Sequence, residues 1–343
     1  MNLTINNFRI INNLNINFHK NIYFIYGNNA SGKTSIIEAI YYLGTTKSFR
    51  TSNVYELIKQ NKEFLRINLI LNKNEYQIVL TKTSKFISIN RKEIKKLSEY
   101  LGLLQIVVFT TSDLNLINGT PADKRSFLDL EISKLNQFYL KELSMYLKLI
   151  KKRNAILKKI KINDDYTLLN IVSNELIKPA TYIIQKRIEF INLLNESINA
   201  IKKEYFEKEI YIKYLPNVSD SNLKKHLFNK IENDILLEST SKGPHKDDFQ
   251  ILINNQNAQY YASNGEQRLI VLIIKLAIFK VIKNEVDNNI VLLLDDCLAE
   301  LDHKKRVNFL TKLPKNEKII ITSTHQPEVE LDFEVMKLRR EDE

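Results

Sequence analysis

The sequence predicts an α/β fold in which a strand-rich head is divided by a helical insertion. Strand-like runs fill the first part of the chain, and they return in the last part. Between them Leu, Ile, Lys and Glu dominate at helical spacing. We therefore expect a first head segment at 1–120, a helical arm at 121–240 and a second head segment at 241–343.

The first head segment is expected to contain strands at 3–5, 14–18 and 22–26, with a helix after the third. Apolar and polar residues alternate over 64–90, which predicts antiparallel strands with one exposed face. A short helix at 94–101 and a buried strand at 105–109 complete this segment.

The arm has apolar residues at helical spacing, for example Leu140, Leu143 and Tyr146. Pro179 and Pro216 are expected to interrupt its helices. The apolar repeat is not sustained as heptads, so a long coiled coil is not expected.

The second head segment follows Gly243. Two runs, 249–253 and 258–261, flank Asn254-Asn255 in the manner of a β-hairpin. Beyond them we expect helices and strands in alternation, at 265–282, 290–294, 303–313 and 318–322.

The composition is that of an ordinary globular protein, with 44% hydrophobic and 27% charged residues among 343. The single cysteine, Cys297, excludes an internal disulfide and suits a reducing cytosol. No run approaches the roughly 20 apolar residues of a membrane span, and the N-terminus lacks a signal-peptide pattern. We therefore expect a cytoplasmic protein with no membrane partner.

The net charge of +11 has two explanations. The first explanation is that the protein binds a polyanion, such as nucleic acid or an anionic membrane. Compositional drift would also produce this charge, because Lys, Asn and Ile are heavily used while Gly, Pro and Arg are scarce. The charge therefore permits DNA binding without establishing it.

The segment from Gly27 to Thr34 matches the pattern G-x-x-x-x-G-K-[ST] in full, in a chain with only seven glycines. Backbone N–H groups of such a loop, with the helix that follows, can wrap a β-phosphate. Lys33 would reach the β- and γ-phosphates, and the Thr34 hydroxyl would ligate Mg²⁺. The residues assigned to the nucleotide are Gly27, Asn28, Asn29, Ala30, Ser31, Gly32, Lys33 and Thr34.

The apolar run 290–294 ends in two carboxylates, Asp295 and Asp296. Asp295 would hold Mg²⁺, and Asp296 stands where a general base could deprotonate the attacking water. Without the phosphate loop, the same pattern would equally suit a strand with an exposed acidic turn. His325 follows the strand 318–322, either as a γ-phosphate sensor or as a structural histidine.

The segment from Ser263 to Arg268 opens an amphipathic helix shortly before the acidic strand. Ser263 and the N–H of Gly265 can bind phosphate oxygens at the helix N-terminus, and Gln267 is assigned with them. Ser263 and Glu266 also form the pattern of a capping box, and both interpretations can hold. After the acidic strand, residues 299–302 are either part of a dimer interface or the start of a helix with Asp302 as its N-cap.

The segment 242–248 combines turn-forming residues, cations and carboxylates. It is either a functional loop or a charged turn that joins the arm to the head.

Together these segments resemble the RecF family of bacterial DNA recombination and repair ATPases, collinearly over nearly the whole chain. The matching stretches are Asn7-Phe8-Arg9, Gly27 to Thr34, Glu38 to Tyr41, Thr46 to Arg50, Phe109 to Asp113, Gly119 to Pro121 with Arg125 to Asp129, Gly243 to Asp248, and Leu293 to Asp296 with Glu300 to Asp302. Two positions depart from the family pattern. Glu266 replaces the first Gln of the signature S-x-G-Q-Q, and His325 lies where the family more often has a Thr-rich strand. A carboxylate near phosphate is unfavourable unless it faces away or caps its own helix.

The resemblance implies an ABC-type P-loop ATPase head with an inserted helical arm, which uses ATP and Mg²⁺ and closes as a homodimer. Each site would combine Lys33, Thr34, Asp295 and Asp296 of one protomer with Ser263 and Gly265 of the other. The family acts as a slow ATPase switch that recognises gapped or damaged DNA and helps to load the recombinase with RecO- and RecR-like partners. The candidates for DNA contact are Lys47, Arg50 and Arg125, although phosphate contacts have no local sequence code.

Three other classes of protein share parts of this pattern. In an ABC transporter's ATP-binding subunit, the stretch between phosphate loop and signature is about half as long, and no membrane span adjoins this one. An SMC-like protein needs hundreds of coiled-coil residues in that stretch. A DNA-binding scaffold with an inactive ATP site is disfavoured by the intact Lys33, Thr34, Asp295 and Asp296.

Overall fold

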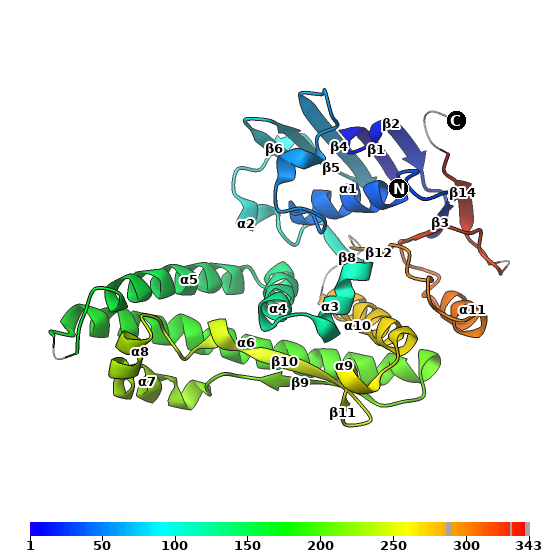
Figure 1. Ribbon diagram of the computed structural model, residues 1–343. Helices are drawn as coiled ribbons and strands as arrows, with labels where there is room; N and C mark the ends of the chain where they lie inside the picture. Colours follow the sequence, from blue (N-terminus) through cyan, green and yellow to red (C-terminus); the bar gives the residue numbers. More distant parts are fainter. Residues whose placement is uncertain (163, 286–289, 330, 340–343) are drawn as a thin grey trace. The chain divides into compact units, whose positions relative to one another are not determined.

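The computed structural model describes residues 1–162, 164–285, 290–329 and 331–339. The chain forms two compact units (Figure 1). The head unit comprises 1–114, 200–207 and 262–343, and the arm unit comprises 115–199 and 208–261. Residues 241–261, expected in the head, therefore cluster with the arm. None of the described helices combines the length and apolar character needed to cross a membrane.

The head unit contains a six-stranded antiparallel sheet in the order β2-β1-β4-β5-β6-β7. Its side chains alternate between buried and exposed along β4 and β5, which confirms the expected half-exposed sheet. The strands are β1 (Asn2–Phe8), β2 (Ile11–Asn17), β4 (Phe64–Leu71), β5 (Asn74–Thr81), β6 (Lys85–Ile89) and β7 (Lys92–Glu93).

A second sheet of the head unit has five parallel strands in the order β14-β3-β13-β12-β8. The three strands β8, β12 and β13 are buried along their whole length, as expected for a parallel sheet covered on both faces. The strands are β3 (Ile22–Tyr26), β8 (Gln105–Phe109), β12 (Ile290–Leu294), β13 (Ile319–Ser323) and β14 (Glu334–Lys337). All but β14 were predicted from the sequence.

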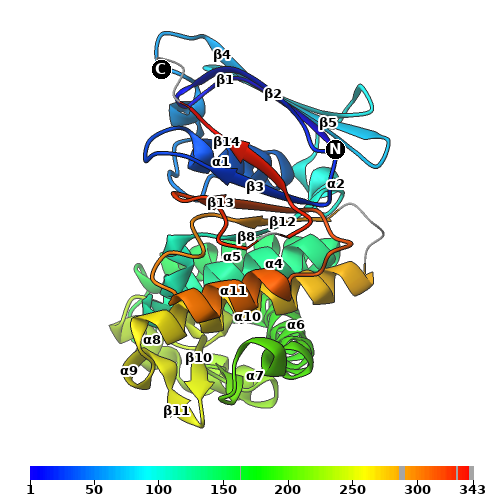
Figure 2. The same cartoon turned by 90° about the vertical axis from the view of Figure 1, so that its right-hand side faces the viewer.

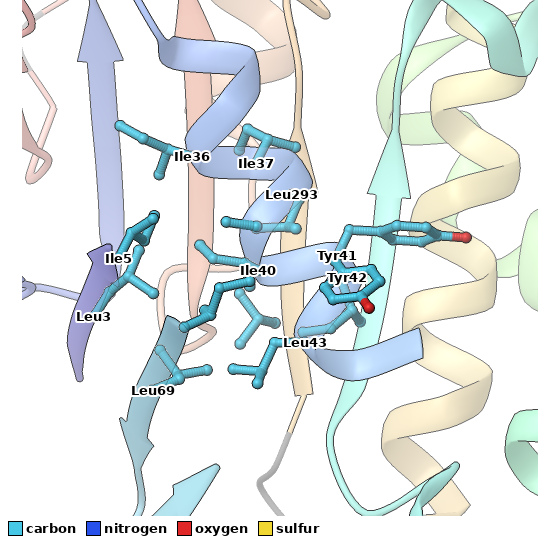
Figure 3. Packing of buried hydrophobic residues seen from close by; sticks show 14 of the residues in the cluster. Leu3, Ile5, Ile36, Ile37, Ile40, Tyr41, Tyr42, Leu43, Leu69 and Leu293 are labelled. Carbon is cyan, nitrogen blue, oxygen red and sulfur yellow. The ribbon is translucent and has the colours of Figure 1, made fainter. Parts of the chain in front are cut away.

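Helix α1 (Lys33–Thr45) lies between these two sheets, as Figure 2 shows. Ile36 and Ile40 of α1 pack with Leu3 of β1, Leu69 of β4 and Leu293 of β12, and all five are fully buried (Figure 3). The other helical segments of the head unit are η1 (Val54–Leu57), α2 (Leu97–Tyr100), η2 (Thr111–Leu114), α10 (Asn264–Glu285) and α11 (His303–Thr311). Helix α10 contacts β8 and β12 and is buried nearly all round, so the expectation of an amphipathic helix here was wrong.

The arm unit contains a helix pair, α5 (Gln137–Leu157) and α6 (Thr167–Tyr205), of which residues 200–205 belong to the head unit. The two run antiparallel: the Nε of Arg153 donates to Ser173 at 2.9 Å, and the Nε of Arg187 donates to Tyr139 at 3.2 Å. The other helices are α3 (Asn115–Asn118), α4 (Pro121–Leu135), α7 (Asp220–Asn229), α8 (Ile231–Leu236), η3 (Pro244–Lys246) and α9 (Ala258–Tyr261). A three-stranded antiparallel sheet, ordered β11-β10-β9, joins β9 (Ile210–Leu215), β10 (Asp248–Ile253) and β11 (Gln256–Asn257).

In the arm unit the structure differs from three expectations drawn from the sequence. Pro179 lies inside α6 and does not interrupt it, because buried neighbours such as Leu176 and Ile183 hold the helix through packing. The hairpin turn at Asn254-Asn255 is confirmed, with both residues at positive φ, but its second strand is only Gln256–Asn257, and 258–261 is helical. Because β10 pairs along its length with β9 of the arm, the hairpin clusters with the arm and not with the head.

Candidate nucleotide-binding site

The candidate site lies at the carboxyl ends of three neighbouring parallel strands of the head unit. Strand β13 pairs with β3 on one side and with β12 on the other. The chain leaves β3 into the loop Gly27–Gly32, leaves β12 into Asp295 and Asp296, and leaves β13 into Thr324 and His325. In open α/β sheets this edge is the usual place for a ligand.

The phosphate loop needs glycine at two positions for different reasons. Gly32 has φ +104, a backbone conformation that residues with side chains rarely adopt. At Gly27 a Cβ atom would lie 2.3 Å from the carbonyl oxygen of Leu338, so no side chain fits. The loop is therefore held in one shape, which ends directly at the first turn of α1.

Lys33 extends back over this loop. Its Nζ donates to the carbonyl oxygens of Gly27 and Asn28, each at 2.7 Å. Only 8% of the residue is exposed. Burial lowers the pKa of the ammonium, and the nearby carboxylates of Asp296 and Asp295 oppose that effect. The cation is thus positioned by the backbone that would surround a phosphate.

Asp295 accepts hydrogen bonds from two threonine hydroxyls. Its Oδ1 accepts from the Oγ1 of Thr322 at 2.6 Å and from the Oγ1 of Thr34 at 3.1 Å. Burial raises the pKa of the carboxyl, against the opposite effect of these two hydrogen bonds. Thr322 was not predicted as a functional residue, although its place at the end of a buried strand was visible.

The donor set suits Mg²⁺. A hydroxyl and a carboxylate oxygen, from Thr34 and Asp295, are hard ligands of the kind this cation prefers. Within the described part of the chain, no group of three or more His, Cys, Asp or Glu side chains could hold a metal alone. In proteins Mg²⁺ usually keeps several waters and is bound by one or two protein ligands together with substrate phosphates.

Asp296 adopts a left-handed backbone conformation, with φ +47. Its N–H donates to the Oγ1 of Thr322 at 3.1 Å, so the residue is fixed relative to Asp295. Non-glycine residues with positive φ are uncommon, and they recur at functional sites.

Lys33, Thr34, Asp295 and Asp296 line one pocket of about 1390 Å³ in the head unit. The pocket is lined by Arg9 to Leu14, Asn29 to Ile36, Phe49, Arg50, Glu56, Ile58 to Gln60, Thr110 to Ser112, Asp295, Asp296, Thr324, Leu338 and Arg339. Of the residues assigned to the nucleotide, Gly27 and Asn28 contribute their carbonyls to Lys33 and are not in this lining.

Two arginines of the pocket are joined to the buried Glu38 of α1. Arg9 binds it bidentately, with Nε–Oε2 and Nη2–Oε1 distances of 3.0 and 2.8 Å, and Arg50 lies 3.4 Å from it. Arg50, one of the three candidates for DNA contact, thus lies in the nucleotide pocket and contacts Glu38 there. The other two candidates differ: Lys47 is exposed in the head unit, whereas Arg125 in the arm donates to the carbonyl of Asp247 at 2.8 Å.

His325 lies beside the main pocket and not in its lining. It belongs to a smaller pocket of about 260 Å³, which shares Asp296 and Thr324 with the larger one. Its Nδ1 lies 2.9 Å from the Oγ1 of Thr324, and its N–H donates to the Oγ of Ser323 at 3.2 Å. The histidine therefore contacts the pocket through its neighbour.

The N-terminus of α10 carries the capping box expected from the sequence. The Oε2 of Glu266 accepts from the N–H and the hydroxyl of Ser263, at 2.9 and 3.1 Å. Glu266 thus caps its own helix. Gln267 donates to the carbonyl of Ala262 at 3.2 Å. Among the described residues that line the main pocket, none comes from the segment Ser263–Gln267.

Arg268, also on α10, was missed as a site residue. It is 2% exposed, and its Nη1 donates to the carbonyls of Asp296 and Ala299, at 3.1 and 2.6 Å. It therefore fixes the loop that carries the two acidic residues. The only signal in the sequence is an arginine that directly precedes the apolar run 269–274 of the helix.

In the segment 242–248 of the arm, Gly243, Pro244 and Asp247 are buried, whereas Lys246 is exposed. Asp247 is 1% exposed, and its Oδ2 accepts from the Nη1 of Arg187 at 2.8 Å and from the Tyr214 hydroxyl. The second oxygen, Oδ1, accepts from the N–H of Asn217 at 2.8 Å. Arg187 also binds Asp129, with an Nη2–Oδ1 distance of 2.8 Å. Both carboxylate oxygens of Asp247 thus accept hydrogen bonds from other residues of the arm.

The family model described as "RecF/RecN/SMC N terminal domain" matches residues 1–343. The chain is 39% identical over 337 residues to "DNA replication and repair protein RecF" of Acholeplasma laidlawii, covering 98% of this chain and 97% of that protein. It is 39% identical over 330 residues to the protein of the same name from Clostridium perfringens, covering 93% and 91%.

Solved structures similar to this one include a RecF-ATP structure and an SMC head. "Structure of the recombination mediator protein RecF-ATP in RecFOR pathway" matches with a TM-score of 0.87 and 30% identity over 98% of this chain and 94% of that one. An SMC head bound to the C-terminal winged-helix domain of ScpA matches with a TM-score of 0.54 and 14% identity, over 95% of this chain and 89% of that one, which supports the fold alone.

The fold and the site define an ATPase head of the ABC type, the class that SMC heads share. Within that class the chain belongs to the RecF family, as the near full-length relatives and the shared structure show. The resemblance drawn from the motifs is thereby confirmed.

Proposed function

We propose that this chain is an ATP-dependent DNA-binding protein of recombinational repair and replication restart. It binds ATP with Mg²⁺, closes as a homodimer on gapped or double-stranded DNA, and hydrolyses ATP slowly as a DNA-stimulated switch. It assists recombinase loading with RecO- and RecR-like partners. The observation that carries the proposal is the hydrogen bond from Thr34 to Asp295, beside the buried Lys33, in a pocket with room for a nucleotide.

ATP is the ligand that this pocket fits best. The loop around Gly32 and the first turn of α1 offer N–H groups to the β-phosphate, and Lys33 supplies a positive charge for the γ-phosphate. The similar RecF-ATP structure gives independent support, because it matches over nearly the whole chain.

When bound, Mg²⁺ would neutralise charge that develops on the β- and γ-phosphates. Thr34 and Asp295 would hold it through the two oxygens that share a hydrogen bond in this structure. Asp296 accepts a proton from water while the water oxygen attacks the γ-phosphorus and ADP leaves. Lys33 stabilises the charge on the transferred phosphoryl group. His325, through Thr324, senses whether the γ-phosphate is present.

The separation of Ser263, Gly265 and Gln267 from the pocket of their own protomer supports the proposal of a homodimer. We propose that these residues contact the ATP of the partner protomer, whose phosphates then lie at the N-terminus of α10. Because neither protomer completes a site alone, ATP stabilises the dimer by mass action.

DNA is proposed as the polyanionic partner on the basis of the net charge of +11 and the family. Relatives of similar length are named DNA replication and repair proteins, and the similar structure is of RecF in the RecFOR pathway. Lys47 is the exposed candidate for a phosphate contact on the head unit.

The test is the binding of gapped duplex DNA at one fixed salt concentration, with and without Mg²⁺ and ATP, while protein mass is followed. Tighter binding with ATP, at the mass of a dimer, is the expected result. DNA affinity that is the same with and without ATP would contradict the proposal. It would indicate a DNA-binding scaffold whose ATP site is inactive. No binding in either condition would remove DNA as the partner.

Asp296→Asn sharpens this test. Asparagine tolerates the left-handed backbone at this position, so the loop should keep its shape. The variant should bind ATP, dimerise and bind DNA like the wild type, yet persist as the ATP-bound dimer because hydrolysis stops. Normal turnover in this variant would exclude Asp296 as the base.

A further inference from the structure

Helix α5 of the arm has an unbalanced charge. Over Gln137–Leu157 its only carboxylate is Glu142, whereas its exposed lysines are Lys141, Lys148, Lys151 and Lys152. The neighbouring helix α6, by contrast, carries both signs, with Glu175, Glu189 and Glu196 among its lysines. The excess on α5 is therefore local and does not follow from the lysine-rich composition of the whole chain.

Three of these lysines form one row, which we call the α5 stripe: Lys141, Lys148 and Lys152. At 3.6 residues per turn their side chains leave the helix within about 40° of one another. They are spaced by about 10 Å and then about 6 Å along the helix axis. The opposite face is buried, with Tyr139, Tyr146, Leu149, Ile150, Arg153 and Leu157.

The charges of the stripe are not neutralised. Some other lysines of the arm are paired with carboxylates, as in Lys134–Glu131 at 2.9 Å and Lys186–Glu189 at 2.5 Å. Within the described residues no lysine of the stripe forms an ion pair. Lys141 alone has a close neighbour, the Phe138 ring, whose centroid lies 5.9 Å from its Nζ.

We propose that the α5 stripe binds the phosphate backbone of duplex DNA. A DNA strand presents one phosphate for about every 3.4 Å of helix axis, so lysines about 6 and 10 Å apart can each reach a separate phosphate. Flexible ammonium groups without partners suit contacts that fix position and carry no sequence information. The inference rests on the proposed function for its partner, DNA, but does not depend on the ATP site, and it adds an arm surface to the candidates named above.

The test compares K141Q/K148Q/K152Q with the wild type. Binding of a gapped duplex and of an unrelated duplex is measured with ATP over a series of salt concentrations. Each lost phosphate contact should reduce the slope of log affinity against log salt by about 1, so the variant should lose about 3. Binding should weaken equally for the two sequences, because only the backbone is read.

The matched control is K178Q/K224Q/K225Q, which removes the same charge from other exposed lysines of the arm. Its slope should stay close to that of the wild type. An unchanged slope in the stripe variant, or an equal loss in the control, would overturn the inference while leaving DNA binding intact. ATP-driven dimerisation should be unaffected in both variants. If the wild type itself bound no duplex, the proposed function would fail, and the inference with it.

Discussion

The Thr34 hydroxyl donates a hydrogen bond of 3.1 Å to the Oδ1 of Asp295, and so joins the phosphate loop to the acidic strand end. The two residues come from opposite ends of the head sequence, on either side of the arm insertion. Thr322 donates to the same oxygen at 2.6 Å. One buried carboxylate oxygen thus connects the ends of β3, β13 and β12, where we propose that Mg²⁺ is held.

Lys33→Met should lower ATP affinity on the order of 10- to 100-fold, because a charge-assisted hydrogen bond is worth about 1.5–3 kcal/mol. It should also abolish ATP-driven dimerisation. Equilibrium binding of a fluorescent ATP analogue, with mass measurement, checks both. Lys47→Met is the control, since Lys47 is exposed and lies outside the pocket lining. Equal losses in the two variants would refute the assignment of Lys33.

Asp295→Asn should affect the stability of the fold and the binding of Mg²⁺ and ATP differently. Burial raises the pKa of Asp295, so its charge is a cost to the folded state at neutral pH. The variant should therefore be at least as stable to urea as the wild type when no nucleotide is present, but it should lose Mg²⁺-dependent ATP binding. A marked loss of stability, or retained metal dependence, would contradict this role.

The raised pKa of Asp295 also sets the direction of a pH effect. A group whose folded-state pKa is raised contributes stability at low pH that is lost as pH rises through that pKa. Binding Mg²⁺ needs the carboxylate, so Mg²⁺-dependent ATP affinity should fall as pH is lowered, beginning above the ordinary value of 3.8. Calorimetry in two buffers should detect proton release on binding. Affinity that rises toward low pH would exclude this account.

Glu266→Gln should strengthen ATP-driven dimerisation. Glutamine can keep the capping box with Ser263, while the negative charge near the partner's phosphates is removed. We expect a gain of about 1 kcal/mol per site, or roughly fivefold in affinity. Sedimentation at graded ATP measures it. Glu266→Ala is the comparison, since it also removes the cap and should destabilise α10 by about 1 kcal/mol. A dimer no tighter in Glu266→Gln would show that the carboxylate does not face phosphate.

Asp247→Ala should destabilise the arm by about 3 kcal/mol, because it leaves Arg187 buried without one of its partners. Asp248→Ala is the matched control: its contact with Lys124 is 3.6 Å long and partly exposed, so its loss should cost under about 1 kcal/mol. Urea unfolding of both variants gives the comparison. ATP binding that collapses in Asp247→Ala without a loss of stability would argue for a functional loop at this segment.

Much of the head was predictable because its elements follow simple patterns. The buried strand before Gly27, the alternation over 64–90 and the apolar run before Asp295 each gave a strand in the right place. Strand β14 was missed, since its pairing with β3 depends on tertiary contact. The predicted interruption at Pro179 was wrong, because the packing of α6 outweighs the local cost of proline in a helix.

The candidate site was predictable where function demands a fixed local sequence, as at Gly32, Lys33 and Thr34. What could not be predicted were contacts made by ordinary residues through the fold, such as Thr322 to Asp295 and Arg268 to the carbonyl of Asp296. The same holds for the segment 242–248, whose charges have partners far away in the sequence. Pairing of this kind leaves no periodic signal in the chain.

The most direct test of the central claim, an ATP site completed by a partner protomer, is the mass of wild type and Gly265→Glu with Mg²⁺ and ATP. A Cβ at Gly265 would meet only the carbonyl oxygen of Glu300, at 3.5 Å, so the first side-chain atom is accommodated within its own protomer. We predict that wild type doubles in mass, whereas Gly265→Glu binds ATP and stays monomeric. A variant that dimerises like wild type, or a wild type that stays monomeric with ATP bound, would contradict the account.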